Sequence, residues 1–141
     1  YITNLTITTT ITITIYCTII NYQASTICID HQLVIVHNRN DQLSTLLTEA
    51  LEKFNAGKYA AKKLVTSNLA LNETYTLTFV LEFTELPEAR EYLDRVLQQI
   101  LDTGNFVNFK FDIFVITKEN FGTFYRTKAL DEYLAFYDRN Y

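Results

Sequence analysis

The chain opens with a regular alternation of apolar and polar residues between Leu5 and Ile19. The odd positions are mostly Ile and the even positions are almost all Thr. A period of two built from β-branched side chains predicts an extended strand with one apolar and one polar face. At about 3.3 Å per residue, this alternating segment would span roughly 50 Å, well beyond the usual strand. We therefore expect it to bend, to change sheets or to pair with another chain.

Further strands are predicted where the period of two returns. The clearest lie over 27–37, 74–84 and 106–117, and the first of these is apolar on both faces near its end, as in a central strand. In 74–84 the aromatic side chains at odd positions are expected to face the core together. The pattern over 58–67 fits two structures, a prolonged helix or a short strand over Ala61–Thr66, and the strand is slightly favoured.

Helices are predicted where the apolar spacing changes to three and four residues. A continuous apolar stripe runs over 43–54, after Asn and Asp residues that can cap a helix and before a stop at Gly57. A second helix is predicted to begin at Pro87 and to end at Gly104. After a loop around 120–123, the pattern predicts a last helix over 127–139.

These elements predict an α+β fold. Read from residue 27, the order is βαββαβ when 58–67 is extended, which is the ferredoxin-like order, with an extra long N-terminal strand and a C-terminal helix. We expect a mainly antiparallel sheet with helices on one face. No linker divides the chain, so 1–141 is expected to be a single domain in which 1–20 forms a β-strand or arm used between subunits. The periodicity predicts these core residues: Leu46, Phe54, Phe79, Leu97, Phe109 and Phe111.

The composition argues against several classes of function but does not identify one. A hydrophobic content of 48% indicates a folded domain, and the net charge of −4 argues against general binding to nucleic acid or anionic membranes. No apolar run approaches the roughly 18 residues of a transmembrane helix. Because the chain contains no Met, residue 1 is not expected to be the translational start. Cys17 and Cys28 are expected to face opposite sides of neighbouring strands and to remain unbridged.

Candidate catalytic groups are few. His31 and His37 are six residues apart on one predicted strand, roughly 20 Å, so they cannot share a metal ion. The sequence Tyr125-Arg126-Thr127-Lys128 matches the Tyr-x-x-Lys of rolling-circle replication endonucleases, but the His-x-His pair of those enzymes is missing. We therefore expect no catalytic residue, no metal site and no cofactor.

One stretch resembles a known family. In Tyr75–Leu101 a strand ending in Phe83-Thr84-Glu85 leads into a helix that opens Pro87-Glu88-Ala89. This unit looks like the strand–helix unit of phage tail-terminator and tail-completion proteins. The resemblance implies a small α/β subunit that forms rings at the head–tail junction. It extends to no binding residue and does not cover the alternating segment.

The sequence thus favours a structural or assembly subunit whose partners are copies of itself or neighbouring structural subunits. A long uncharged strand is a natural template for pairing between chains. The predicted oligomer interface consists of Leu5, Ile7, Thr8, Thr10, Ile11 and Thr12. The resemblance would place such a subunit in a virion; otherwise a cytoplasmic protein is expected.

The alternative is a ferredoxin-like regulatory module or nucleic-acid-binding module. Lys58, Lys62 and Lys63 could form a small basic patch for such a role, although a solvated surface is favoured by the acidic balance of the chain. An enzyme is the least favoured class.

Overall fold

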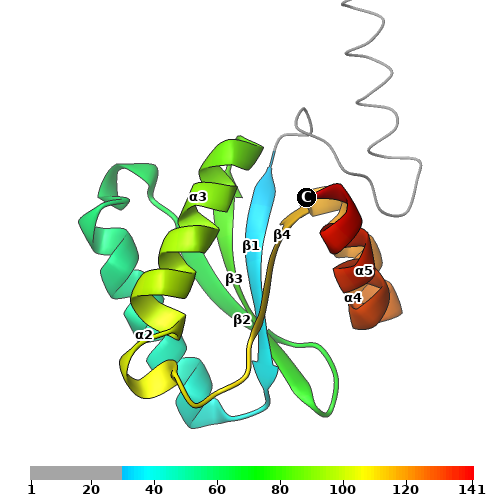
Figure 1. The fold of residues 1–141 in the computed structure, drawn as a ribbon, viewed down its shortest axis with the longest axis horizontal. Helices are drawn as coiled ribbons and strands as arrows, with labels where there is room; N and C mark the ends of the chain where they lie inside the picture. Colours follow the sequence, from blue (N-terminus) through cyan, green and yellow to red (C-terminus); the bar gives the residue numbers. More distant parts are fainter. Residues whose placement is uncertain (1–29) are drawn as a thin grey trace, which may run out of the picture.

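The computed structural model describes residues 30–141, which form a four-stranded sheet and four α-helices (Figure 1). The predicted strand over Leu5–Ile19 and both cysteines lie outside the described residues. The strands are β1 (His31–Asn38), β2 (Val65–Ala70), β3 (Tyr75–Phe83) and β4 (Asp112–Thr117). The helices are α2 (Asp41–Gly57), α3 (Leu86–Val96), α4 (Lys118–Thr127) and α5 (Leu130–Asn140).

The sheet is antiparallel throughout, in the order β2-β3-β1-β4. β1 pairs with β3 on one side, where Ile35 lies opposite Thr78, and with β4 on the other, where Ile35 lies opposite Ile113. All but the last of its eight residues are buried. The prediction of a central strand, apolar on both faces, is confirmed, and so is the α+β class with an antiparallel sheet.

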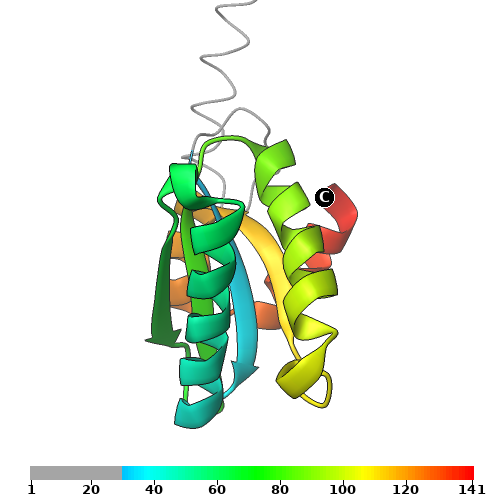
Figure 2. The same ribbon diagram turned by 90° about the vertical axis from the view of Figure 1, so that its left-hand side faces the viewer.

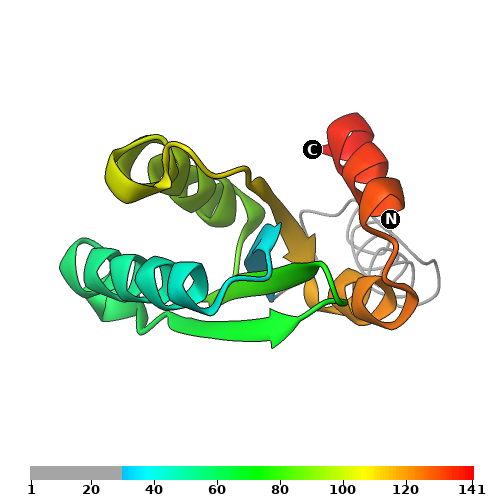
Figure 3. The same ribbon diagram turned by 90° about the horizontal axis from the view of Figure 1, so that it is seen from below.

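Helices cover both faces of this sheet. α2 and α3 lie side by side against one face (Figure 2), where Leu33 and Ile35 join their core cluster. α4 and α5 lie on the other side (Figure 3), where Val34 and Val36 pack with Phe124 of α4. The prediction of helices on one face therefore holds for α2 and α3 and is wrong for the C-terminal pair. The physical reason is in β1 itself, since a strand with apolar residues on both faces needs a cover on each.

A bulge at one end of the β1–β3 ladder changes which side chains face which layer. His31 pairs with Phe83 and Leu33 with Val80, so three steps along β3 match two along β1. Phe83 consequently belongs to the α2/α3 core, whereas Phe79 packs on Phe121 of α4. The prediction that all odd residues of 74–84 face one core is therefore wrong at the bulge.

Two other predictions on packing are corrected. Strand β4 begins at Asp112 and not at 106, because the chain before it forms a 3-10 turn over Gly104–Phe106 and a loop. Phe109 in that loop is 45% exposed, and Leu46 on α2 is 37% exposed, so neither is a core residue. The remaining four predicted core residues are partly buried and pack against the two clusters.

The helix boundaries follow local signals. The side chain of Asn40 accepts a hydrogen bond from the Leu43 backbone N–H, which confirms a cap before α2. α3 continues as a π-turn over Leu97–Leu101, close to the predicted end. Residues 120–123, predicted as a loop, lie inside α4, whose first turn is capped by Thr117.

In the segment 58–67 the structure has a short 3-10 turn and the start of a strand, and the prolonged helix is not formed. A 3-10 turn covers Ala60–Lys62, Lys63 adopts a left-handed conformation with φ of 53°, and β2 begins only at Val65. The favoured strand is thus present but starts later than Ala61 and extends to Ala70. β2 is the outermost strand on this side of the sheet.

Candidate interaction surface

The two edges of the sheet differ in what covers them. At β4 the Tyr133 hydroxyl donates a 2.8 Å hydrogen bond to the Val115 carbonyl. Tyr137, one helical turn on, packs against both core clusters, which places α5 across the outer side of β4 (Figures 1 and 3). A second copy of the chain could not pair with β4 without displacing α5.

The opposite edge, formed by β2, is open in the part of the chain that the structure describes. No described strand pairs with its outer side. Its sequence, Val-Thr-Ser-Asn-Leu-Ala, contains neither a charged residue nor Pro, the usual protections of an edge strand. Val65, its first residue, is 48% exposed. We refer to the outer side of Val65–Ala70 as the β2 edge.

The backbone groups that the β2 edge presents follow from the ladder. The Leu71 N–H donates to the Tyr75 carbonyl at the hairpin end, so Leu71 faces β3. Because backbone groups alternate along an antiparallel strand, Leu69 and Ser67 also face β3, and the groups of Ala70, Asn68 and Thr66 face outward. The Tyr125 hydroxyl donates to the Ala70 carbonyl at 3.1 Å, as an outward carbonyl allows. Thr66 and Asn68 thus define the centre of the open edge.

The side chains of β2 alternate between the two faces of the sheet. Thr66 accepts a 3.3 Å hydrogen bond from the amide of Asn55, and Asn68 lies 2.7 Å from the hydroxyl of Thr48, so this row faces α2. On the other face Val65 is exposed and Leu69 is half-buried. One face of β2 thus carries Val65, Ser67 and Leu69, and the other carries Thr66, Asn68 and Ala70. The alternation of Leu5–Ile19 is matched only in part, because Ser67 interrupts the apolar row and Ala70 ends the polar row.

The polar row continues across the sheet to His37. Thr78 on β3 lies 2.6 Å from the side-chain oxygen of Asn68 and 3.0 Å from Nε2 of His37. His37 is only 1% exposed, and this burial lowers the pKa of its imidazole, while a hydrogen bond to the Asn38 carbonyl opposes the shift. A chain of hydrogen bonds through Thr78 and Asn68 thus connects His37 on β1 to Thr48 on α2.

His31, the other histidine, is also buried. It lies at the opposite end of β1 from His37, and no group of three or more metal-ligating side chains occurs among residues 30–141. The structure therefore does not bring the two histidines together.

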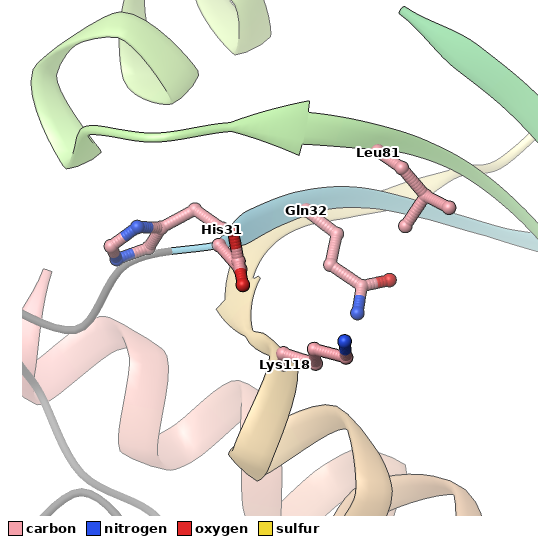
Figure 4. A pocket seen from close by; sticks show the side chains of 5 residues that line it. His31, Gln32, Leu81 and Lys118 are labelled. Atoms are coloured by element: carbon pink, nitrogen blue, oxygen red, sulfur yellow. The ribbon is translucent and has the colours of Figure 1, made fainter.

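A small cavity of about 220 Å³ lies at the His31 end of β1, lined by Asp30, His31, Gln32, Leu81 and Lys118. Figure 4 shows the amide of Gln32 and the ammonium group of Lys118 approaching each other, while the imidazole of His31 points away from them. Gln32 is 5% exposed, and its side-chain oxygen has no hydrogen-bond partner in the described structure. The cavity thus places the polar groups of Gln32 and Lys118 in the same lining as the carboxylate of Asp30.

The lysines of the predicted basic patch are mostly engaged with acidic residues of α3. Lys62 forms a 2.7 Å ion pair with Glu88, and Lys58 lies 3.8 Å from Glu91. Lys63 follows them at the left-handed turn before β2. The patch therefore alternates positive and negative charges instead of forming a basic field.

The Tyr-x-x-Lys match also has a structural explanation. The Nζ of Lys128 stands 3.3 Å from the centroid of the Tyr125 ring, and the Tyr125 hydroxyl is bound to Ala70. A cation over an aromatic face stabilises the end of α4. The pair links this helix to β2.

The predicted oligomer interface, Leu5, Ile7, Thr8, Thr10, Ile11 and Thr12, lies outside the described residues. What the sequence analysis missed is the β2 edge. The available signal was the absence of charge and Pro over 65–70, next to a segment of uncertain structure.

Comparisons with known proteins identify no relatives. No protein-family model matches the chain, and neither the curated proteins nor the solved structures contain a significant match. Across residues 30–141, no helix has the length and apolar content needed to span a membrane.

Proposed function

We propose that this chain is a non-enzymatic assembly subunit that associates with copies of itself through residues 1–20. The observation that carries the proposal is the open and uncharged β2 edge, in a chain whose first 29 residues also contain no charged residue and no Pro. Exposed strands without such protection pair with other strands. A chain with two unprotected features of this kind is suited to association.

We also propose that the described domain has a ferredoxin-like fold with α4 and α5 as an added layer. The βαββαβ order from β1 to β4 and the sheet order β2-β3-β1-β4 support this. A phage tail-terminator or tail-completion role is the specific form of the proposal, resting on the resemblance of Tyr75–Leu101. Such a role requires subunits that close into a ring.

The alternative, a regulatory or nucleic-acid-binding module, receives less support. An open sheet face with exposed aromatic side chains is the usual platform for single-stranded RNA. Here Phe79 packs on Phe121 of α4, and Lys58 and Lys62 face carboxylates of α3. Both features reduce what nucleic acid could contact.

The proposal is tested by the mass of the chain in solution, measured by sedimentation velocity over a range of concentrations. Full-length protein is expected to form oligomers larger than a dimer, as rings or filaments require. A variant lacking residues 1–20 is expected to remain folded by circular dichroism and to sediment as a smaller species. A variant lacking only residues 1–4, which precede the alternating segment, is the matched control and should assemble like the parent. A monomeric full-length chain, or normal assembly without residues 1–20, would contradict the proposal.

A further inference from the structure

We infer that the β2 edge is the acceptor of the alternating segment from a neighbouring copy, which adds to the sheet as an antiparallel strand. This inference rests on the proposed function and names the surface through which it operates. It follows from four features: the choice of edge, the backbone groups, the side-chain rows and the length of the segment.

The two edges of the sheet differ in how far α5 and Tyr125 cover their outward carbonyl groups. The Tyr133 hydroxyl occupies the Val115 carbonyl at the outer side of β4, so that edge is closed. At β2, the Tyr125 hydroxyl occupies only the Ala70 carbonyl, at the last residue of the strand. The acceptor is therefore the stretch Val65–Leu69.

The backbone of this stretch can support a new ladder. The N–H and C=O groups of Thr66 and Asn68 face away from β3, and two such residues are what an antiparallel partner needs for alternate pairs of hydrogen bonds. Outside the strand ladders, neither backbone N–H makes a backbone hydrogen bond among the described residues. Strand addition supplies affinity through these main-chain bonds and specificity through alternate side chains.

The side chains of the two strands match at Val65 and Leu69 on one face and at Thr66 and Asn68 on the other, although Ser67 interrupts the apolar row. An added strand that turns its Leu and Ile positions toward the face of Val65 and Leu69 covers these two apolar side chains. The same strand places its Thr residues beside the Thr66 and Asn68 row. A shift of one residue would reverse both rows, so the alternation fixes the register to steps of two.

The length of the alternating segment favours addition between copies. β2 has six residues, whereas the segment from Leu5 to Ile19 would be more than twice as long. Pairing within one copy leaves the excess, which is uncharged and apolar at every second position, beyond the end of the sheet. Between copies the excess bridges the two domains. Since each copy then carries one donor segment and one acceptor edge, head-to-tail addition produces a ring or a filament.

Two substitutions on the edge test the inference in the full-length chain. Thr66→Pro removes an outward N–H without removing a bond to β3, and Pro is tolerated on edge strands for this reason. Val65→Lys places a charge on the exposed apolar row, and Val107→Lys, at a loop residue that is 58% exposed, is its matched control. Both edge variants are expected to lose assembly while keeping the parent's circular dichroism, and Val107→Lys is expected to assemble normally.

A mixing experiment separates the two halves of the contact. The Thr66→Pro variant keeps a donor segment, and the variant lacking residues 1–20 keeps an acceptor edge. Neither should assemble alone, but together they should form a one-to-one complex in sedimentation velocity. This readout is a gain of association, so a misfolded variant cannot imitate it.

The outcomes distinguish the inference from the proposed function. If removal of residues 1–20 abolishes assembly while both edge variants assemble like the parent, the acceptor is elsewhere and the inference is wrong, although the proposed function stands. If the truncated chain also assembles, both are wrong. A full-length chain that is monomeric, with its own segment on its own β2 edge, overturns addition between copies.

Discussion

The bulge in β3 makes a quantitative prediction about two phenylalanines that lie four residues apart. Phe83 is fully buried, with its ring centroid 4.9 Å from that of Tyr92 in the α2/α3 core. Phe83→Ala should leave a closed cavity and lower the free energy of unfolding by about 3–5 kcal/mol. Phe79 is partly exposed on the other face of the sheet, beside Phe121. The space left by Phe79→Ala should be open to water, so no closed cavity forms. The free energy of unfolding should then fall only by the contribution of the buried apolar area, about 1–2 kcal/mol.

Urea denaturation followed by far-ultraviolet circular dichroism measures both values. The slope of the unfolding free energy against urea should be the same in the parent and both variants, which shows that the denatured states are comparable. A regular strand with no bulge would place both rings on one face and give them similar costs. Equal losses within about 0.5 kcal/mol, or a larger loss for Phe79→Ala, would refute the assignment of these residues to opposite layers.

Two further predictions concern buried polar groups. The Tyr92 hydroxyl donates a 2.5 Å hydrogen bond to the side-chain oxygen of Asn55. Tyr92→Phe should therefore leave a buried acceptor unpaired and lower the free energy of unfolding by about 1–3 kcal/mol. Tyr125→Phe loses a hydrogen bond at the surface, so it should lower the free energy of unfolding by less in the same urea titration. Burial lowers the pKa of His37 from its ordinary value of 6.5, so the unfolded chain binds more protons than the folded chain just below that pH. The free energy of unfolding should therefore hold above about pH 6.5 and fall as the pH drops below it. The fall should be smaller in His37→Gln, and an unchanged pH profile in that variant would show that His37 does not titrate in this way.

Much of the fold is predictable because periodicity records burial. The α2 stripe was correct in its main line, since Leu43, Leu47 and Leu51 are all buried. The prediction for Leu46 is wrong because this residue lies to the side of that line. Only the position of neighbouring elements decides whether such a side position is covered. The same limit explains Phe109, whose alternation with Phe111 has the period of a strand but precedes the point where β4 meets β1.

The two C-terminal helices show a second limit of sequence patterns. The short run from Lys118 to Thr127 contains Gly122, and its sequence predicts a loop over 120–123 where the structure has a helix. Its apolar residues are helical in spacing, but they pack on a face of the sheet that the predicted one-layer arrangement left open. Local patterns predict elements better than they predict which face of a sheet an element covers.

Of the two parts of the proposed contact, the sequence predicts only the donor segment and not the acceptor edge. The alternation in Leu5–Ile19 indicates a donor of strand contacts from sequence alone. The acceptor depends on sheet order, because Val65–Ala70 is an open edge only when β3 lies between β2 and β1 and α5 closes the far side. Nothing in the six residues of β2 indicates that order.

Amide hydrogen exchange along β2 tests strand addition most directly. In the assembled full-length chain, the outward N–H groups of Thr66 and Asn68 should exchange slowly, because the added strand accepts their hydrogen bonds. In the chain lacking residues 1–20 these two amides should exchange quickly, while the inward amides of Ser67 and Leu69 remain protected in both. Equal exchange of Thr66 and Asn68 with and without the N-terminal residues would contradict pairing of that segment with the β2 edge.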